Sequence, residues 1–349
     1  MRVLQAMAGA VHGGAETFFE RLACAFAARG LDQSVAIRSH AERRARLERA
    51  GVTVTELPFG GWLDRQTVPA LADLSDALAP DIVMTWMNRA TRAYARARAR
   101  AACRPLHVAR LGGYYDLKYY RGCDYLIGNT PDIVAYLEAG GWPAARARYL
   151  PNFVDAEPAP AVARDSLDTP DDATLVLAMG RLHQNKAFDV LIDALVDLPG
   201  HWLWLAGVGP LEAALRQQAG TAGVLDRVRF LGWRDDIPAL LAAADIFVCP
   251  SRHEPLGNVV IEAWAHGVPA VACRAQGPSQ LIEDEENGLL VPIDDARALV
   301  ESVRRAGETE VARNLIAAGT AAYRRDFSQQ TVVDAYLEFF ASLPVPEAV

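Results

Sequence analysis

The sequence predicts an α/β protein of two domains, each built on a doubly wound parallel sheet. Short apolar segments alternate with helical segments along both halves of the chain, and such alternation is typical of parallel sheets. Between the two series lies a stretch rich in Pro, Ala and Asp, residues 155–172, which reads as a linker. The chain has 349 residues, of which 51% are hydrophobic, so it is long enough to bury two separate cores.

The strands are predicted from short apolar runs bounded by turn-forming residues. In the first half they span residues 3–7, 34–37, 52–57, 82–86, 107–111, 125–128 and 148–150. In the second half they span residues 175–179, 202–206, 228–231, 246–249, 270–272 and 289–291. Helices are expected between them, for example over residues 15–28 and 69–79, and a last helical stretch, residues 329–340, follows the second series.

The charge is unevenly distributed along the chain. The net charge is −8, but residues 1–155 carry 20 Lys and Arg against 15 Asp and Glu, whereas residues 156–349 carry 15 against 28. This acidic net charge argues against nucleic acid as a partner of the protein. The basic first half suits an anionic acceptor or an anionic membrane surface. Four arginines fall on one face of a helix expected over residues 90–102, a face that is either solvated or in contact with a membrane: Arg89, Arg92, Arg96 and Arg100.

The cysteines and the apolar runs indicate the compartment. No apolar run approaches the roughly 20 residues of a membrane-spanning helix, and the chain begins with a strand instead of an export signal. Five cysteines, an odd number without a CxxC pair, read as small buried residues in a reducing cytosol. We expect a cytoplasmic protein, with peripheral contact at the inner face of the plasma membrane as the extension that the arginine face suggests.

The most informative feature is a pair of glutamates eight positions apart, Glu254 and Glu262. After an apolar strand, a helix is predicted to begin near Leu256 or Gly257, so the first amides of the helix lack intrahelical partners and form an anion site. Because helical side chains lean toward the N-terminus, the two carboxylates would flank a phosphate bound there. One would hold sugar hydroxyls and the other ribose hydroxyls, as a nucleotide sugar requires. An isolated pair would more often be two solvated glutamates, but strand, loop and helix start together favour the site.

With this segment, the chain resembles the retaining glycosyltransferases of family 4, which include glycogen synthases and bacterial envelope glycosyltransferases. The resemblance covers nearly the whole length and rests on the order and spacing of its motifs. These are HGGAETFF at 12–19, PNFVD at 151–155, GRLHQNKAFDVLIDAL at 180–195, LAGVGPLEAAL at 205–215, FLGWRDDIPALLAAADIFVCPS at 230–251, RHEPLGNVVIEAWAHGVPAV at 252–271 and NGLLVP at 287–292.

The resemblance implies the GT-B fold, in which two Rossmann-like domains face a cleft. Residues 1–155 would form the acceptor-binding domain and residues 156–328 the domain that binds the nucleotide sugar. Residues 329–349 would carry a C-terminal helix that crosses back to the first domain.

Two cations are assigned to the catalytic step together with Glu254. The charge on a departing diphosphate must be stabilised by a metal ion or by fixed cations. The chain contains no DxD motif, so we expect neither a metal nor another cofactor. Arg181 follows a strand and Lys186 is predicted to begin the next helix, at the carboxyl end of a parallel sheet where α/β proteins bind ligands. Lys186 and Lys118 are the only lysines among 35 basic residues, which favours a specific role for the ammonium group.

Further donor contacts follow from the resemblance. In the first domain, Gly14 lies in a glycine loop that lets a backbone approach a phosphate and that equally fits a tight turn. In the second, Gly207 would line the base pocket or form a turn, and Arg234 lies where the family holds the nucleobase. Glu262 would bind the ribose and Glu254 the transferred sugar. The residues at the helix start that would contact the diphosphate are Leu256, Gly257, Asn258 and Val259.

The first domain departs from the family at one strand. Many relatives carry a histidine at the end of the strand that matches residues 107–111, and His107 lies too early for that role, so we interpret it as a satisfied strand residue. A tyrosine-rich segment follows instead, in which aromatic faces would stack on sugars and Lys118 would hold an acceptor phosphate or carboxylate; a packed loop is the alternative. The acceptor-binding candidates are Asn88, Lys118 and Tyr119.

The predicted function is a metal-independent retaining glycosyltransferase. It would move a sugar from a nucleoside-diphosphate sugar, such as a UDP-sugar, to a hydroxyl of a cell-envelope glycan or lipid-linked acceptor, for example in lipopolysaccharide biosynthesis. Two alternatives stay open. A nucleotide-sugar epimerase uses the same fold but needs acid and base groups on the sugar ring, and an inactive sugar-nucleotide-binding subunit would account for the missing histidine.

Overall fold

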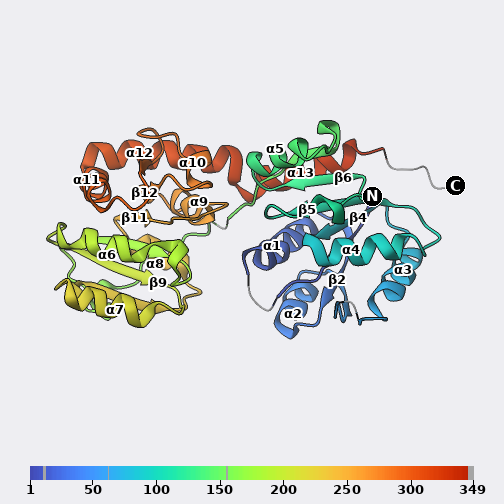
Figure 1. Cartoon of the computed structure of the whole chain (residues 1–349), viewed down its shortest axis with the longest axis horizontal. Coiled ribbons are helices and arrows are strands. Elements are labelled where there is room, and N and C mark those ends of the chain that lie inside the picture. The colour runs from blue at the N-terminus through green and yellow to red at the C-terminus, as the bar shows by residue number, and fades with distance from the viewer. Residues whose placement is uncertain (11–12, 62, 155, 345–349) are drawn as a thin grey trace. The chain divides into compact units, whose positions relative to one another are not determined.

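The computed structural model describes residues 1–10, 13–61, 63–154 and 156–344. The chain divides into two compact units, Met1–Phe153 with Gln329–Val349, and Val154–Ser328 (Figure 1). We call them the first unit and the second unit. His12, which opens one motif, and Asp155, at the expected domain boundary, lie outside the described residues.

The first unit contains a parallel sheet in which the described strands number seven, in the order β3-β2-β1-β4-β5-β6-β7. The strands are β1 (Arg2–Met7), β2 (Asp32–Arg38), β3 (Thr53–Leu57), β4 (Ile82–Trp86), β5 (Leu106–Leu111), β6 (Tyr125–Gly128) and β7 (Ala147–Tyr149). The helices are α1 (Gly14–Ala28), α2 (Ala41–Arg49), α3 (Thr67–Leu78), α4 (Met87–Arg98), α5 (Pro131–Ala139) and α13 (Gln329–Ser342). The strand order reverses between β1 and β4, which is the switch point where doubly wound sheets bind ligands.

Both faces of the first sheet are covered by helices. Val3 of β1 packs in one core with Phe19 of α1 and Tyr336 of α13, whereas its neighbour Leu4 packs in another core with Tyr94 of α4. Because successive side chains of a strand point to opposite faces, a strand that is buried on both faces is apolar throughout. This explains why β1 and β4 could be recognised from short continuous apolar runs.

The second unit repeats this plan with six strands among its described residues, in the order β10-β9-β8-β11-β12-β13. The strands are β8 (Thr174–Met179), β9 (His201–Ala206), β10 (Val228–Gly232), β11 (Ile246–Cys249), β12 (Ala270–Cys273) and β13 (Leu289–Val291). The helices are α6 (Phe188–Val196), α7 (Glu212–Thr221), α8 (Ile237–Ala243), α9 (Asn258–Ala265), α10 (Pro278–Leu281), α11 (Ala296–Ala306) and α12 (Thr309–Ala322). Here the order reverses between β8 and β11, so the switch point lies between these two strands.

The fold class is confirmed as two Rossmann-like parallel-sheet units. Every predicted strand overlaps an observed one, because buried parallel strands carry a strong apolar signal. One helix start was wrong. Lys186 ends a 3-10 turn, η4 (Gln184–Lys186), and α6 begins at Phe188, because Ala187 adopts a left-handed conformation with φ of 50°. The predicted start of the helix near Gly257 is confirmed, because α9 begins at Asn258 with Gly257 as its N-cap, so only the start at Lys186 was wrong.

The described residues contain no helix long and apolar enough to cross a membrane. In the same part of the chain no cysteine forms a disulfide bond. Cys123, Cys249 and Cys273 are buried, whereas Cys24 and Cys103 are partly exposed.

Candidate active site

The carboxyl ends of β8 and β11 bring together the residues that the sequence analysis assigned to the diphosphate and the sugar. The two strands pair through Ile246 with Val176 and Phe247 with Leu177. The loop after β8 leads to Lys186, and the loop after β11 leads to Glu254. Residues that are 68 positions apart therefore meet at the switch point of the second sheet.

Lys186 and Glu254 form an ion pair there, between Nζ and Oε2. The Lys186 side chain is 21% exposed and that of Glu254 is 11% exposed, so the pair is largely enclosed by protein. Burial by itself would lower the pKa of Lys186, but the negative charge of Glu254, the hydrogen bond to it and the charge of Glu262 outweigh burial, so the pKa of Lys186 lies above the usual value. Lys186 is therefore a fixed cation at neutral pH.

The loop that carries Glu254 is held against the loop that carries Lys186 by backbone bonds. The amides of Arg252 and His253 donate to the carbonyl oxygen of Asn185 at 2.8 and 3.1 Å. The Arg252 guanidinium adds ion pairs to Asp189 and Asp294, both at 2.6 Å. Asn185 and Arg252 thus position the pair, although sequence reasoning assigned neither a role.

Glycines allow these loops to approach each other closely. A Cβ atom at Gly180 would lie 2.9 Å from Cε of Lys186, and a Cβ at Gly207 would lie 1.9 Å from the Gly180 carbonyl oxygen. Both glycines have positive φ, 140° and 145°. Any side chain at either position would displace the Lys186 loop. Gly207 is therefore a packing residue of the site. Gly180 opens the motif at 180–195 and packs against Lys186, although no role was predicted for it from the sequence.

Helix α9 starts beside the ion pair. Gly257 is its N-cap with φ of 72°, and no side chain caps the helix. The Gly257 amide lies 3.4 Å from Oε1 of Glu254, while Asn258 and Val259 occupy the first two helical positions. Leu256, which is partly buried, precedes the cap. Amides at a helix start next to a lysine are the arrangement for which the sequence analysis predicted anion binding, and this binding stays a prediction.

The other donor-site candidates of the second unit lie in different surroundings. Glu262 is partly buried in the second turn of α9 and close enough to Lys186 to raise its pKa. Arg181 is exposed and makes no ion pair with any described residue, which leaves its guanidinium available to a ligand. Arg234 is instead occupied, because its guanidinium forms two hydrogen bonds to the carboxylate of Asp236.

The first-unit candidates lie in separate places. Gly14 begins α1, and a Cβ there would meet nothing within 4 Å, so the position is open. The Asn88 side-chain oxygen is buried and lacks a hydrogen-bond partner among the described residues. Lys118 pairs with Asp116 at 2.5 Å, and its Nζ lies 4.8 Å from the ring centroid of Tyr119.

His107 is a buried strand residue, as expected, but it is only half satisfied. Its Nε2 is hydrogen-bonded to the hydroxyl of Thr85 at 2.9 Å, whereas its Nδ1 has no partner within the described part of the chain. Burial lowers the pKa of His107 to about 3, so the ring is neutral. It therefore serves the core of the first unit and carries no charge toward a substrate.

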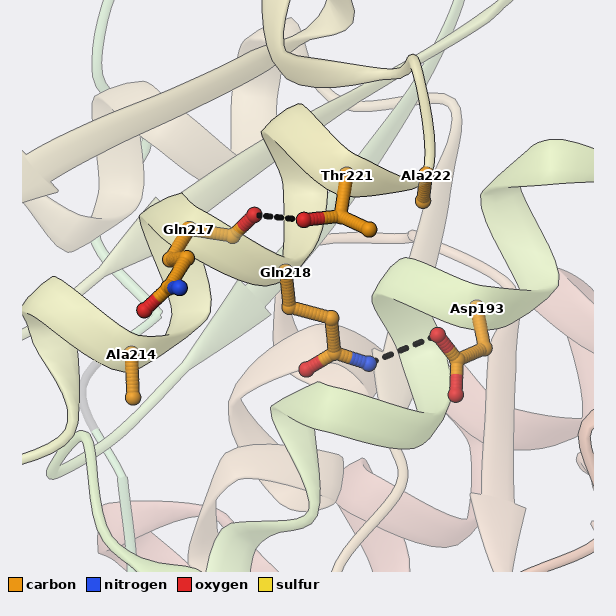
Figure 2. A pocket seen from close by; sticks show the side chains of 6 residues that line it. All are labelled: Asp193, Ala214, Gln217, Gln218, Thr221 and Ala222. Carbon is orange, nitrogen blue, oxygen red and sulfur yellow. Dashed lines mark hydrogen bonds between the residues drawn. The ribbon is translucent and has the colours of Figure 1, made fainter.

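A surface groove between α6 and α7 is separate from this site (Figure 2). Its volume is about 370 Å³. In Figure 2 the amide of Gln218 donates to Asp193, at 2.6 Å, across the groove. None of the residues that line it belongs to the predicted site, and the Gln218 carboxamide is already engaged with Asp193 and with the Asp189 carbonyl oxygen.

Comparison with known proteins identifies the family. Residues 13–152 match the model of the glycosyl transferase 4-like domain, and residues 173–308 match the model of the glycosyl transferases group 1. The chain is 38% identical over 336 residues to the lipopolysaccharide core biosynthesis glycosyltransferase LpsE of Rhizobium meliloti (strain 1021), covering 95% of this chain and 97% of that one. It is also 38% identical over 332 residues to LpsD of the same strain, covering 94% and 95%.

Solved structures show the same architecture. Anabaena Alr3699/HepE in complex with UDP and glucose superposes with a TM-score of 0.82 at 24% identity, covering 98% of this chain and 100% of that one. A glycosyltransferase from Rickettsia africae ESF-5 superposes with a TM-score of 0.86 at 17% identity, covering 97% of each chain. The chain therefore belongs to the glycosyl transferases group 1 family and is a glycosyltransferase with the GT-B fold.

Proposed function

We propose that this glycosyltransferase moves a sugar from a nucleoside-diphosphate sugar to a hydroxyl group of a lipopolysaccharide core acceptor, with retention of configuration and without a metal ion. The observation that carries the proposal is the enclosed Lys186–Glu254 pair at the start of α9, at the switch point of the second sheet. A cation, the amides of a helix start and a carboxylate side by side match the diphosphate and the sugar of such a donor.

Lys186 has two alternative partners in this proposal. Without a donor it pairs with Glu254. When a donor binds, a diphosphate oxygen takes the place of the carboxylate beside Nζ, and Glu254 accepts hydrogen bonds from sugar hydroxyls instead. Arg181, which has no ion pair with a described residue, adds a second cation, and the amides of Asn258 and Val259 add neutral donors.

The nucleoside end of the donor lies farther along α9. Glu262, in the second turn, accepts hydrogen bonds from the ribose hydroxyls. Because Arg234 is held by Asp236, we assign the base contact to the backbone near Gly232 and leave the Arg234 side chain as a support for that loop. Anabaena Alr3699/HepE was solved with UDP and with UDP-glucose, which supports a uridine nucleotide as the first donor to test.

The reaction needs no separate base from the protein. The acceptor hydroxyl oxygen forms a bond to the anomeric carbon on the face that the diphosphate leaves, while the bond from that carbon to the phosphate oxygen breaks. The hydroxyl proton passes to an oxygen of the departing phosphate, and Lys186, Arg181 and the amides at the start of α9 stabilise the negative charge. Attack and departure on one face retain the anomeric configuration.

The acceptor is assigned to the first unit. LpsE and LpsD are named for lipopolysaccharide core biosynthesis, and the chain covers nearly all of both. The arginine face along α4 suits an anionic acceptor or the membrane that carries it. Arg89, Arg92 and Arg96 of α4, and Arg100 just after the helix, are exposed and form no ion pair with a described residue. Lys118 and Tyr119 lie on η1 (Leu117–Tyr119), which contacts α4.

Incubation of the pure protein with uridine, guanosine and adenosine diphosphate sugars tests the proposal. Slow release of free nucleoside diphosphate, accelerated by a deacylated lipopolysaccharide core oligosaccharide, is the expected result. Conversion of the donor sugar without release would establish an epimerase, and binding without either reaction would establish an inactive subunit. NMR of an early product with the opposite anomeric configuration would exclude retention, and activity lost in EDTA and restored by a divalent ion would exclude a metal-independent reaction.

A further inference from the structure

Three strands of the first sheet end side by side at its carboxyl edge. β4, β5 and β6 are parallel neighbours, and the register of β5 with β6 runs without a shift up to Leu111 and Gly128. Asn88 lies just past the end of β4, Gly112 follows β5 directly, and Asn129 follows β6 directly. The fold therefore places two carboxamides at this edge with a glycine between them.

Neither carboxamide is used by the fold. The side-chain oxygens of Asn88 and Asn129 are buried, and across the described residues neither finds a hydrogen-bond partner. Asn129 is only 5% exposed. The adjacent Thr130 differs, because its hydroxyl caps α5 by accepting from the Ile133 amide at 3.1 Å. Buried polar groups without partners are few in native proteins since each lowers stability, so a pair of them at a ligand-binding edge calls for a ligand.

Gly112 keeps space open between the two carboxamides. A Cβ atom at this position would meet only the Asn129 side-chain nitrogen, at 3.8 Å, and Gly112 is partly exposed. Its φ lies outside the left-handed region, so backbone conformation does not require a glycine here. The absent side chain instead leaves open the space beside the Asn129 carboxamide at the edge of the sheet.

The spacing of the carboxamides suits one sugar ring. Neighbouring strands lie about 4.8 Å apart, so positions on β4 and β6 are separated by about 10 Å. A hydroxyl hydrogen bond of about 2.8 Å at each end leaves about 4 Å between the two hydroxyl oxygens. Hydroxyl groups on one pyranose ring provide such a separation.

The charges nearby favour a neutral ligand over an anion. The Glu16 carboxylate fills the space over Gly9 beside the end of β1, the neighbour of β4, and accepts from the Ala10 amide at 2.7 Å. Arg110, the cation on β5, is buried with its guanidinium bonded to the hydroxyl of Tyr336 at 2.7 Å, and Arg89, which follows Asn88, is exposed. A phosphate would meet a carboxylate here, whereas hydroxyl groups find acceptors.

We propose that Asn88, Gly112 and Asn129 form a binding site for a neutral sugar ring, the ring of the acceptor that receives the transferred sugar. The identification of this ring as the acceptor rests on the proposed function; the site itself does not. A carboxamide donates and accepts hydrogen bonds, as a sugar hydroxyl does, so each asparagine selects a hydroxyl group at its end of the ring. The arginine face of α4 then serves the anionic part of the acceptor, and this site serves its reacting sugar.

Saturation-transfer NMR with methyl glycosides of glucose, galactose, mannose and a heptose tests the site on the full-length protein without a donor. We expect one or more of these glycosides to bind the wild-type protein. Asn129→Leu, which keeps the shape and removes the polar atoms, should bind that glycoside about tenfold more weakly. Asn129→Asp, which keeps an acceptor oxygen, should recover part of the affinity. Gly112→Val should block binding with both asparagines in place, and Asn314→Leu on the exposed face of α12 is the matched control.

Folding is checked by the melting temperature of every variant. A wild-type protein that binds none of the glycosides, or an Asn129→Leu variant that is folded and binds as the wild type does, overturns the site. Equal competition by inorganic phosphate would also overturn it, because it would mark an anion site. Release of nucleoside diphosphate from the donor is measured in parallel on the wild type. Its absence would contradict the proposed function, whereas loss of glycoside binding in Asn129→Leu would still support this site.

Discussion

At the switch point of the second sheet, charged side chains form an ion pair. At the carboxyl edge of the first sheet, two neutral side chains have buried oxygens without a hydrogen-bond partner among the described residues. Lys186 and Glu254 form an enclosed ion pair, and the backbone around them is fixed by hydrogen bonds to Asn185. The side-chain oxygens of Asn88 and Asn129 are also buried near strand ends, but they find no partner in the part of the chain that the structure describes. The same sheet topology therefore carries one site whose side chains pair with each other and one whose side-chain oxygens have no partner in the described part of the chain.

The difference follows from the charge of the groups. A buried cation without a counterion costs far more than a buried amide, so a cation needed by a diphosphate must have an internal partner when the donor is absent. A carboxamide can remain unpartnered at a smaller cost. We infer that this protein binds the charged groups of its substrates with residues that form an ion pair when the substrate is absent. It binds hydroxyl groups with side chains that have no partner among the described residues.

The largest effect is expected from removing the cation of the second unit. Lys186→Ala should lower kcat by about 100- to 1,000-fold, because it removes a charge aimed at the leaving group and leaves Glu254 buried without its partner. Lys186→Arg should recover only part, since the enclosed space beside Gly180 fits an ammonium group. Steady-state kinetics with saturating donor measures this. Arg297→Ala, at an exposed position of α11, is the control, and full activity in Lys186→Ala would remove the lysine from the mechanism.

The next effect concerns the first unit and its arginine face. Replacement of Arg89, Arg92, Arg96 and Arg100 by serine should weaken binding to anionic liposomes by up to about 1,000-fold, since each basic residue near such a surface contributes about 1 kcal/mol. Flotation with anionic and neutral vesicles at two salt concentrations measures it, because salt screens exposed charges. The matched control replaces Arg297, Arg304, Arg313 and Arg325 of the second unit. Equal, negligible binding of the wild-type protein to both kinds of vesicle would rule out the membrane contact.

A smaller effect separates the two glutamates of the donor site. Glu262→Gln should weaken binding of free nucleoside diphosphate by about tenfold, because it loses charge-assisted bonds to the ribose. Glu254→Gln should not weaken that binding, since it releases Lys186 from its internal partner, but it should lower the rate of transfer. Calorimetry with the free nucleotide and kinetics with the sugar nucleotide measure the two steps. Equal weakening by both substitutions would show that the roles are not divided as proposed.

A stability measurement sharpens the comparison at the neutral site. Asn129→Leu should raise the melting temperature by about 2 to 4 °C, because it removes a buried polar group without a partner, worth about 1 kcal/mol. Asn314→Leu, at an exposed position, should change it little. Scanning calorimetry checks both. A lower melting temperature in Asn129→Leu would show that the side chain already supports the fold.

The smallest effect is a pH dependence at the charged site. The pKa of Lys186 is higher in the folded protein than the ordinary value of 10.5. The pair therefore contributes its full stability below about pH 10.5, and this contribution is lost as the pH rises through the raised pKa. The difference in melting temperature between the wild type and Lys186→Met should stay constant up to about pH 10 and shrink as the pH rises above about 10.5. Lys118→Met removes an exposed pair and should give a small difference throughout.

Much of this molecule follows from its sequence. Strands buried on both faces, such as β1 and β4, are continuous apolar runs, and their alternation with helices defines a parallel sheet. Lys186, Glu254 and Glu262 were brought into one hypothesis because each lies in a motif at the end of a strand or the start of a helix, where local pattern and ligand chemistry coincide.

The tertiary structure decided what depends on contacts between distant segments. The pairing of Lys186 with Glu254, the support from Asn185 and the occupation of Arg234 by Asp236 depend on how loops pack, and no periodicity records that. No motif or spacing in the sequence singled out Asn129, because a single asparagine after a strand is common. It became informative only when β6 was placed next to β5 and β4, which put it at the same edge as Asn88 and left both oxygens buried without a partner among the described residues. Local sequence determines which segments are strands, whereas strand order and packing determine which side chains at their ends share a site.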